Sequence, residues 1–240
     1  MVGPFAPAEG KRLNGKSANI TAIWLVHPLD PQSHWVAQNQ TQGYYLRVES
    51  SANKPNWDGL FDTSAAQAGY FTTCQAAQAG YSTQLLHKHI RGGRVSRVRR
   101  GIYRLVHFPA AEHEELAVAW LWSDKFGIFS HQTALSLHVL SDTLPVQLHL
   151  TLPSDWQNRR FRVPTGVILH YADVLPRERA WFGPVPVTSP RRSLNECARD
   201  GLSPELLQQA AQQALRRGLV TRVELEDVEV ALKPFGGLVA

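Results

Sequence analysis

Residues 71–108 read FTTCQAAQAGYSTQLLHKHIRGGRVSRVRRGIYRLVHF, and this stretch decides the fold of the region around it. Its central helix is expected to begin after Ser82, because a serine side chain accepts hydrogen bonds from the first free backbone N–H groups. Gly92 and Gly93 end the helix, since glycine takes the left-handed conformation without a Cβ clash. At about 100° per residue, one face gathers the side chains to be buried: Leu85, Leu86, His89 and Ile90. The opposite face gathers hydrogen-bonding and cationic side chains: Thr83, Gln84, His87, Lys88 and Arg91. Such a polar face is typical of a helix that lies in the major groove of DNA.

The flanking segments predict further helices and a hairpin. Residues 57–69 are expected to form a first helix that ends at Gly69, and Thr72 or Thr73 can cap a short second helix that ends at Gly80. Beyond the central helix, apolar residues are spaced for a half-buried β-hairpin with its bend near Gly101: Val95, Val98, Ile102 and Leu105. This order of elements predicts a winged helix-turn-helix, which we assign to residues 54–109.

The charge of this region is one-sided. No acidic residue lies between Asp62 and Glu112, whereas the hairpin carries five arginines: Arg94, Arg97, Arg99, Arg100 and Arg104. Each phosphate that a cation neutralises releases counterions, so an uncompensated basic surface favours salt-sensitive binding to double-stranded DNA. The residues expected to contact DNA are therefore Thr83, Gln84, His87, Lys88, Arg91, Arg94, Arg97, Arg99 and Arg100.

The same residues carry a family resemblance. Residues 69–82 follow the pattern G-Y-F-T-T-x-Q-A-x-x-A-G-Y-S, and residues 91–105 follow R-G-G-R-V-x-R-V-R-R-G-I-Y-R-L. Further along, the chain contains FSHQTAL at 129–135 and TSPRRSL at 188–194. The motifs stand in the order and spacing that they have in one known family. Across roughly residues 57–232, the chain resembles the AbiEi-type antitoxins.

This resemblance implies a function. Members of the family repress their own operon by binding inverted repeats in its promoter. They are also the antitoxins of type IV toxin–antitoxin systems, which act in phage defence, and they counteract a nucleotidyltransferase-type toxin without forming a stable complex with it. By the same resemblance, the winged domain would bind DNA and the C-terminal domain would carry the antitoxic role.

Composition is that of an ordinary soluble protein. The chain has 240 residues, of which 43% are hydrophobic and 19% charged, and a net charge of +5. Its two cysteines, Cys74 and Cys197, are far apart, which predicts neither a disulfide framework nor a zinc site. No apolar run approaches the ~20 residues of a membrane span, and no signal pattern opens the chain. We therefore expect a cytoplasmic protein that does not enter a membrane.

Residues 1–53 differ from the rest because Pro, Asn, Gln and Ser dominate them, so we expect a flexible or loosely packed N-terminal extension. Within it, GKRLNGKS at 10–17 matches the phosphate-binding pattern G-x-x-x-x-G-K-[ST]. A working P-loop needs a buried strand before it, whereas residues 1–9 are short and broken by proline. We interpret the match as accidental.

Residues 110–240 predict a mixed α+β domain, so the whole chain is assigned to the α+β class. An amphipathic helix is expected over 112–126 and a second helix after its cap at Ser130. Strands are predicted at 146–151, 161–163, 167–171 and 185–188. Helices are then predicted at 190–201, at 205–217 and after Thr221. A second basic cluster, Arg159, Arg160 and Arg162, has two open interpretations: a contact with the DNA backbone or a solvated sheet edge.

The sequence contains no catalytic set. A nuclease with a similar winged domain would need an Asp followed by Glu-x-Lys to hold Mg²⁺, and the one such triplet, 9–11, lies in the N-terminal extension. His131 and His138 are interpreted as buried or interface histidines rather than ligands. We therefore expect a DNA-binding regulator, not an enzyme, with no metal or cofactor. The alternatives are a winged helix that binds an acidic protein and a nuclease-related DNA-binding protein.

Overall fold

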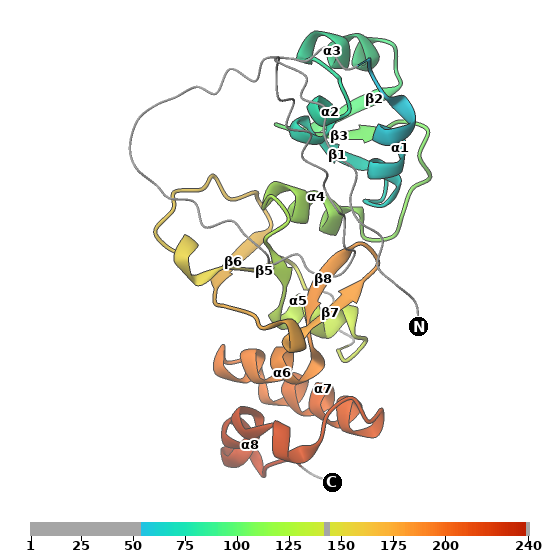
Figure 1. The fold of residues 1–240 in the computed structure, drawn as a ribbon. Coiled ribbons are helices and arrows are strands. Elements are labelled where there is room, and N and C mark those ends of the chain that lie inside the picture. The colour runs from blue at the N-terminus through green and yellow to red at the C-terminus, as the bar shows by residue number, and fades with distance from the viewer. Residues whose placement is uncertain (1–53, 142–144, 239–240) are drawn as a thin grey trace, which may run out of the picture. The chain divides into compact units, whose positions relative to one another are not determined.

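The computed structural model describes residues 54–141 and 145–238. The N-terminal extension and its phosphate-loop pattern lie outside the described residues. Figure 1 shows the order of the elements along the chain. In the described part of the chain, no helix is both long and apolar enough to cross a membrane.

The first segment folds as three helices and a small antiparallel sheet. Its elements are α1 (Trp57–Ala65), β1 (Tyr70–Thr72), α2 (Thr73–Gln78), α3 (Thr83–Arg91), β2 (Val95–Arg99) and β3 (Ile102–Leu105). The strand order is β1-β3-β2, so the hairpin β2–β3 is extended by the short strand that precedes α2.

Local capping explains where these helices begin and end. Thr72 caps α2 in a capping box with Gln75, and the Ser82 side chain accepts from Leu85 N at 3.2 Å. Gly93 takes the left-handed conformation that ends α3, with φ 68°. The helix α1 is shorter than predicted, since it ends at Ala65 rather than next to Gly69. The reason is a tight turn in which Ser64 O accepts from the backbone N–H groups of residues 67 and 69.

This small sheet is covered on both faces. Phe71, Tyr103 and Leu105 point to one face, where they pack with Leu60 of α1 and Leu86 of α3. Side chains alternate along a strand, so Tyr70 and Ile102 point to the other face, where they pack on Ala117, Val118 and Leu121. The strands β1 and β3 are thereby mostly buried on both faces, whereas β2 is exposed from Arg97 to Arg99.

The second face is covered by α4 (Glu114–Trp122). This helix is shorter than the one predicted over 112–126, and it is buried on more than one side instead of being amphipathic. Five of the six positions from 116 to 121 are buried, so burial extends around the helix: Leu116, Ala117, Val118, Ala119 and Leu121. Leu116 and Ala119 pack toward the second sheet, opposite the residues that meet the first one. A helix between two sheets buries more than one stripe, so its sequence loses the simple periodicity. The predicted division between residues 54–109 and 110–240 stays a prediction.

The second sheet is mixed. It consists of β4 (Ile128–Phe129), β5 (Leu148–Leu152), β6 (Val167–Tyr171), β7 (Arg179–Phe182) and β8 (Val185–Thr188), in the order β6-β5-β4-β8-β7. The predicted strand at 161–163 is wrong. Phe161 instead stacks on Trp156, with ring centroids 5.5 Å apart, so this segment is held by its ring rather than by backbone pairing.

Helices complete the C-terminal half: α5 (His131–Leu137), α6 (Pro190–Arg199), α7 (Pro204–Arg216) and α8 (Glu226–Leu232). Short 3₁₀ turns lie at Ser154–Trp156, Pro176–Glu178, Arg222–Glu224 and Lys233–Phe235. Leu135, Leu194, Leu207 and Val228 form the centre of the cluster that joins these helices. Ser189 and Ser203 cap α6 and α7, each followed by proline at the first helical position. Ser130 precedes α5 as predicted, but its hydroxyl makes no cap and accepts from Thr151 Oγ1 at 2.7 Å instead.

Candidate nucleic-acid interface

The helix α3 has the two faces that its sequence predicts. Leu86 is 2% exposed, and Leu85, His89 and Ile90 are half-buried against the core of the small sheet. Thr83, Gln84, His87, Lys88 and Arg91 are all exposed. The turn Gly80–Ser82 joins α2 to α3, and Tyr81 is buried within it. The result is a helix anchored by one face that presents a polar, cationic face to water.

His89 belongs to the anchor. Its ring stacks on Trp57 of α1, with centroids 5.4 Å apart, and meets Tyr81 edge-on at the same distance. Burial, reinforced by the nearby charges of Arg94 and Lys88, lowers the pKa of His89 below its ordinary value. The ring is therefore neutral at pH 7 and adds no charge to the cationic face.

All nine side chains that the sequence predicts to contact DNA are exposed. These are Thr83, Gln84, His87, Lys88, Arg91, Arg94, Arg97, Arg99 and Arg100. None of them forms an ion pair with a carboxylate among the residues that the structure describes. The charges of Lys88 and of the five arginines in this set are consequently available to an external anion.

The strand register divides the hairpin arginines between two faces. Arg97 lies opposite Tyr103, whose ring packs in the cluster that includes Leu86 of α3. The register then shifts, and Arg99 lies opposite Ile102, which packs on α4. Paired residues of antiparallel strands share a face, so Arg97 lies on the α3 side of the sheet. Arg99 lines a groove with Glu114 on the α4 side.

Arg100 and Arg94 occupy the two ends of the hairpin. Arg100 lies in the turn, which is fixed to α2 because Gly101 O accepts from Thr73 N at 2.9 Å. Arg94 lies immediately before β2 in a groove lined by Trp57 and Phe61 of α1. The structure therefore brings Arg97 to the side of α3, and it places Arg94 beside α1 and Arg99 beside α4.

Arg104 differs from the other hairpin arginines because it already has partners. Its Nη2 donates to Glu114 Oε1 at 3.0 Å, and Tyr70 Oη donates to Glu114 Oε2 at 2.6 Å. The hydrogen bond from Tyr70 is the main cause that lowers the pKa of Glu114, while burial and this carboxylate raise the pKa of Tyr70 to about 12. Arg104 thus joins the small sheet to α4 rather than facing DNA.

The second basic cluster is partly occupied within the chain. Arg159 approaches Asp155 at 3.7 Å and stacks over the Trp156 ring at 4.3 Å. Arg160 and Arg162 are exposed in the segment before Pro164. Because no β-strand forms there, the interpretation of this cluster as a guard on a sheet edge loses its basis. The interpretation as a DNA backbone contact stays a prediction.

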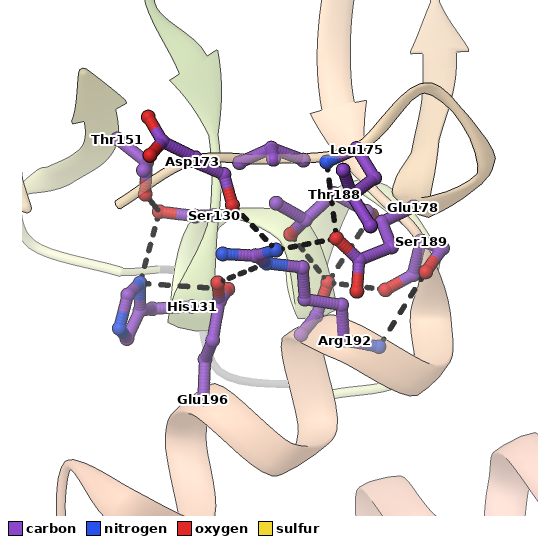
Figure 2. A network of polar contacts seen from close by, with 12 residues as sticks. Ser130, His131, Thr151, Asp173, Leu175, Glu178, Thr188, Ser189, Arg192 and Glu196 are labelled. Carbon is purple, nitrogen blue, oxygen red and sulfur yellow. Dashed lines mark hydrogen bonds and ion pairs between the residues drawn. The ribbon is translucent and has the colours of Figure 1, made fainter. Parts of the chain in front are cut away.

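A buried polar network in the C-terminal half was missed from the sequence. Figure 2 shows Arg192 at its centre, on the first turn of α6. Arg192 donates to Glu196 Oε1 at 2.7 Å, to Glu178 Oε2 at 2.6 Å and to the backbone oxygen of Asp173 at 3.0 Å. Burial lowers the pKa of Arg192, but its bonds to Glu196 and Glu178 more than offset this, so the pKa lies above its ordinary value. The only signal in the sequence was the spacing of Arg192 and Glu196, one helical turn apart.

The histidines of the C-terminal half have different roles. His138 Nε2 lies 2.8 Å from Thr188 O and is half-buried, in agreement with a structural interpretation. His131 is buried, and it lies beside His149 and His170 from the two parallel strands β5 and β6. Sequence spacing could not find this group, because its members come from three elements.

Comparison with known proteins identifies the segment that contains α3. Residues 60–106, from within α1 to the end of the hairpin, match a family model described as a transcriptional regulator, AbiEi antitoxin. A search of curated proteins finds no match to the chain. The segment that carries α2, α3 and the hairpin is thus similar to the AbiEi antitoxin family of transcriptional regulators, the family that the sequence motifs resemble.

Proposed function

We propose that this protein is a sequence-specific DNA-binding repressor that acts as the antitoxin of an AbiE-like type IV toxin–antitoxin system and regulates its own operon. In this proposal α2, α3 and the hairpin form a winged helix-turn-helix, with α3 in the major groove. The proposal rests on the family match and on the properties of residues 54–109.

One observation carries the DNA-binding part. The exposed face of α3 combines the hydrogen-bonding side chains of Thr83 and Gln84 with the cations Lys88 and Arg91, and Arg97 lies on the same side of the sheet. Amide side chains read base edges in the major groove, and arginine and lysine bind phosphate as well as guanine. A face that combines both kinds of side chain suits sequence-dependent binding to duplex DNA.

We further propose that the protein works by binding rather than by catalysis. Within residues 54–141 and 145–238, the group of three or more potential metal ligands is made of histidines, not of the carboxylates that a Mg²⁺-dependent nuclease needs. The toxin partner would be a nucleotidyltransferase that is counteracted without a stable complex, and the site of action would be the cytoplasm. These statements follow the family rather than particular residues.

The proposal is tested by a mobility shift. The full chain is mixed with the DNA upstream of its own gene, or with scrambled DNA of equal length, at about 150 mM salt, where non-specific contacts weaken. Retention of the upstream fragment at a lower protein concentration than the scrambled one is the expected result. Equal and weak retention of both fragments would contradict sequence-specific repression and favour an acidic protein partner for the same face.

Replacing Gln84 tests base recognition directly. Gln84→Ala should reduce the preference for upstream over scrambled DNA by about tenfold, because a good amide–base contact contributes ~1–3 kcal/mol of discrimination. Binding to scrambled DNA should change little, since no charge is lost. The matched control is Gln78→Ala, an exposed glutamine on α2. If the ratio of affinities for upstream and scrambled DNA is the same in Gln84→Ala and Gln78→Ala, Gln84 does not contact a base.

A further inference from the structure

The inner face of the C-terminal sheet holds a cluster of histidines that the proposed DNA-binding function does not use. His149 is on β5, His170 on β6 and His131 at the start of α5. A ring nitrogen of each lies within 4.8 Å of one from each of the others. His131 and His149 are 8% and 7% exposed, and His170 is half-buried. Three imidazoles therefore share one small buried volume.

The contacts between the rings are close. His149 Nδ1 and His170 Nε2 are 3.0 Å apart, and the His131 ring stacks on the His170 ring with centroids 3.6 Å apart. Two nitrogen ligands of one tetrahedral zinc ion, each at about 2.0 Å, are about 3.3 Å apart. The pair His149–His170 thus already has nearly the spacing of two ligands of one ion.

The surroundings supply the supports that metal-bound histidines need. His131 Nδ1 lies 2.9 Å from Ser130 Oγ, which itself accepts from Thr151 Oγ1, and Figure 2 shows the contact between Ser130 and His131. Such hydrogen bonds orient a ligating ring through its second nitrogen. His131 also has φ 51°, a left-handed backbone that is uncommon outside glycine. The position of this ring is fixed by the fold at a conformational cost.

A buried carboxylate with one oxygen that lacks a hydrogen-bond partner lies next to the histidines. Glu196 is 7% exposed, and while its Oε1 accepts from Arg192, its Oε2 has no hydrogen-bond partner among the described residues. This oxygen lies 3.8 Å from His131 Nδ1. Figure 2 marks the contact with a dashed line. A buried carboxylate oxygen with no partner is costly, and a nearby cation would compensate it.

We propose that His131, His149 and His170 form a binding site for a divalent transition-metal ion such as Zn²⁺, with the Glu196 carboxylate beside it as the neutralising anion. Imidazole nitrogen suits zinc and its neighbours in the first transition series rather than Mg²⁺ or Ca²⁺. His131 and His170 also line a cavity of about 340 Å³, which gives an ion a route of entry. The site would tie α5 to β5 and β6, far along the chain from α3.

Metal binding is tested on the full chain without a histidine tag. After treatment with a chelator, the protein is titrated with Zn²⁺ by calorimetry, and Co²⁺ is added separately to read its visible absorption. We expect one strongly bound equivalent, the absorption bands of a tetrahedral cobalt site, and a melting temperature that rises with Zn²⁺ and falls again with chelator.

Matched variants assign the site, because the chain contains 10 histidines in all. His170→Gln keeps a polar side chain beside His149 and should weaken Zn²⁺ binding at least about 100-fold, with loss of the cobalt bands. His107→Gln, an exposed histidine next to the hairpin, should bind as the unmodified chain does. His131→Gln gives a second test of the cluster if His170→Gln does not fold.

Two results would overturn the proposal. In the first, the melting temperature of the unmodified chain changes with neither Zn²⁺ nor chelator, and Co²⁺ gives no absorption bands of a tetrahedral site. The other is equal affinity in His170→Gln, His131→Gln and His107→Gln, because the bound ion would then lie elsewhere. DNA binding is measured independently, so failure of the metal site leaves the proposed function standing, and the reverse also holds.

Discussion

The Arg192→Met variant should unfold with a free energy about 3 kcal/mol below that of the unmodified protein, because removing one member of a buried ion pair leaves an uncompensated buried charge. Arg192 donates to both Glu196 and Glu178, and it also holds the backbone oxygen of Asp173. The side chains of Arg192 and Glu196 are 16% and 7% exposed. Methionine preserves much of the apolar length of arginine, so the lost charge and hydrogen bonds dominate the change.

The measurement is urea unfolding at pH 7 in the presence of a chelator, which keeps any bound metal from compensating Glu196. Arg191→Met is the matched control, since Arg191 is the exposed neighbour on the same helical turn, and its effect should stay within about 0.5 kcal/mol. The double variant Arg192→Met with Glu196→Gln should recover part of the loss, because the buried charge is then gone. Equal stability of Arg192→Met and Arg191→Met would show that the network adds nothing.

Local rules were sufficient wherever a few neighbouring residues determine the structure. Ser82 before α3 and the Ser-Pro pairs before α6 and α7 could be recognised because capping depends on three or four residues. The burial of Leu86 and the exposure of Gln84 follow from the helical period alone. The surface of α3, which carries most of the proposed DNA contacts, was for this reason predictable from the sequence.

Contacts between distant segments set the limit of that approach. The sequence predicts α4 to be amphipathic, because it does not reveal that Leu116 and Ala117 pack against different sheets. Phe161 resembled a strand residue, but its partner ring, Trp156, lies in a 3₁₀ turn. Likewise, His131 stands 18 residues before His149 and 39 before His170, so the three meet only because β5 pairs with β6 and α5 packs on β5. No local pattern encodes such pairings.

The hairpin offers the second large effect, a loss of DNA affinity that does not depend on sequence. Arg97→Ala combined with Arg100→Ala should weaken binding to upstream and scrambled DNA alike, by about tenfold at 150 mM salt. Arg97 lies on the α3 side of the sheet, and Arg100 lies in the turn that Thr73 fixes to α2, so both charges belong to the hairpin of the proposed winged motif. The slope of log affinity against log salt should fall by about 2, since each lost phosphate contact removes ~0.9.

Two controls separate position from total charge. Arg177→Ala with Arg216→Ala removes the same charge from exposed sites on the C-terminal half and should leave the salt slope within about 0.5 of its original value. Arg99→Ala, on the face that meets α4, should cost less affinity than Arg97→Ala, because its side chain lines the groove with Glu114. Equal losses in the two double variants would mean that DNA responds only to the net charge of the chain. In that case the hairpin would make no specific contact with DNA, and α3 would be the only proposed contact.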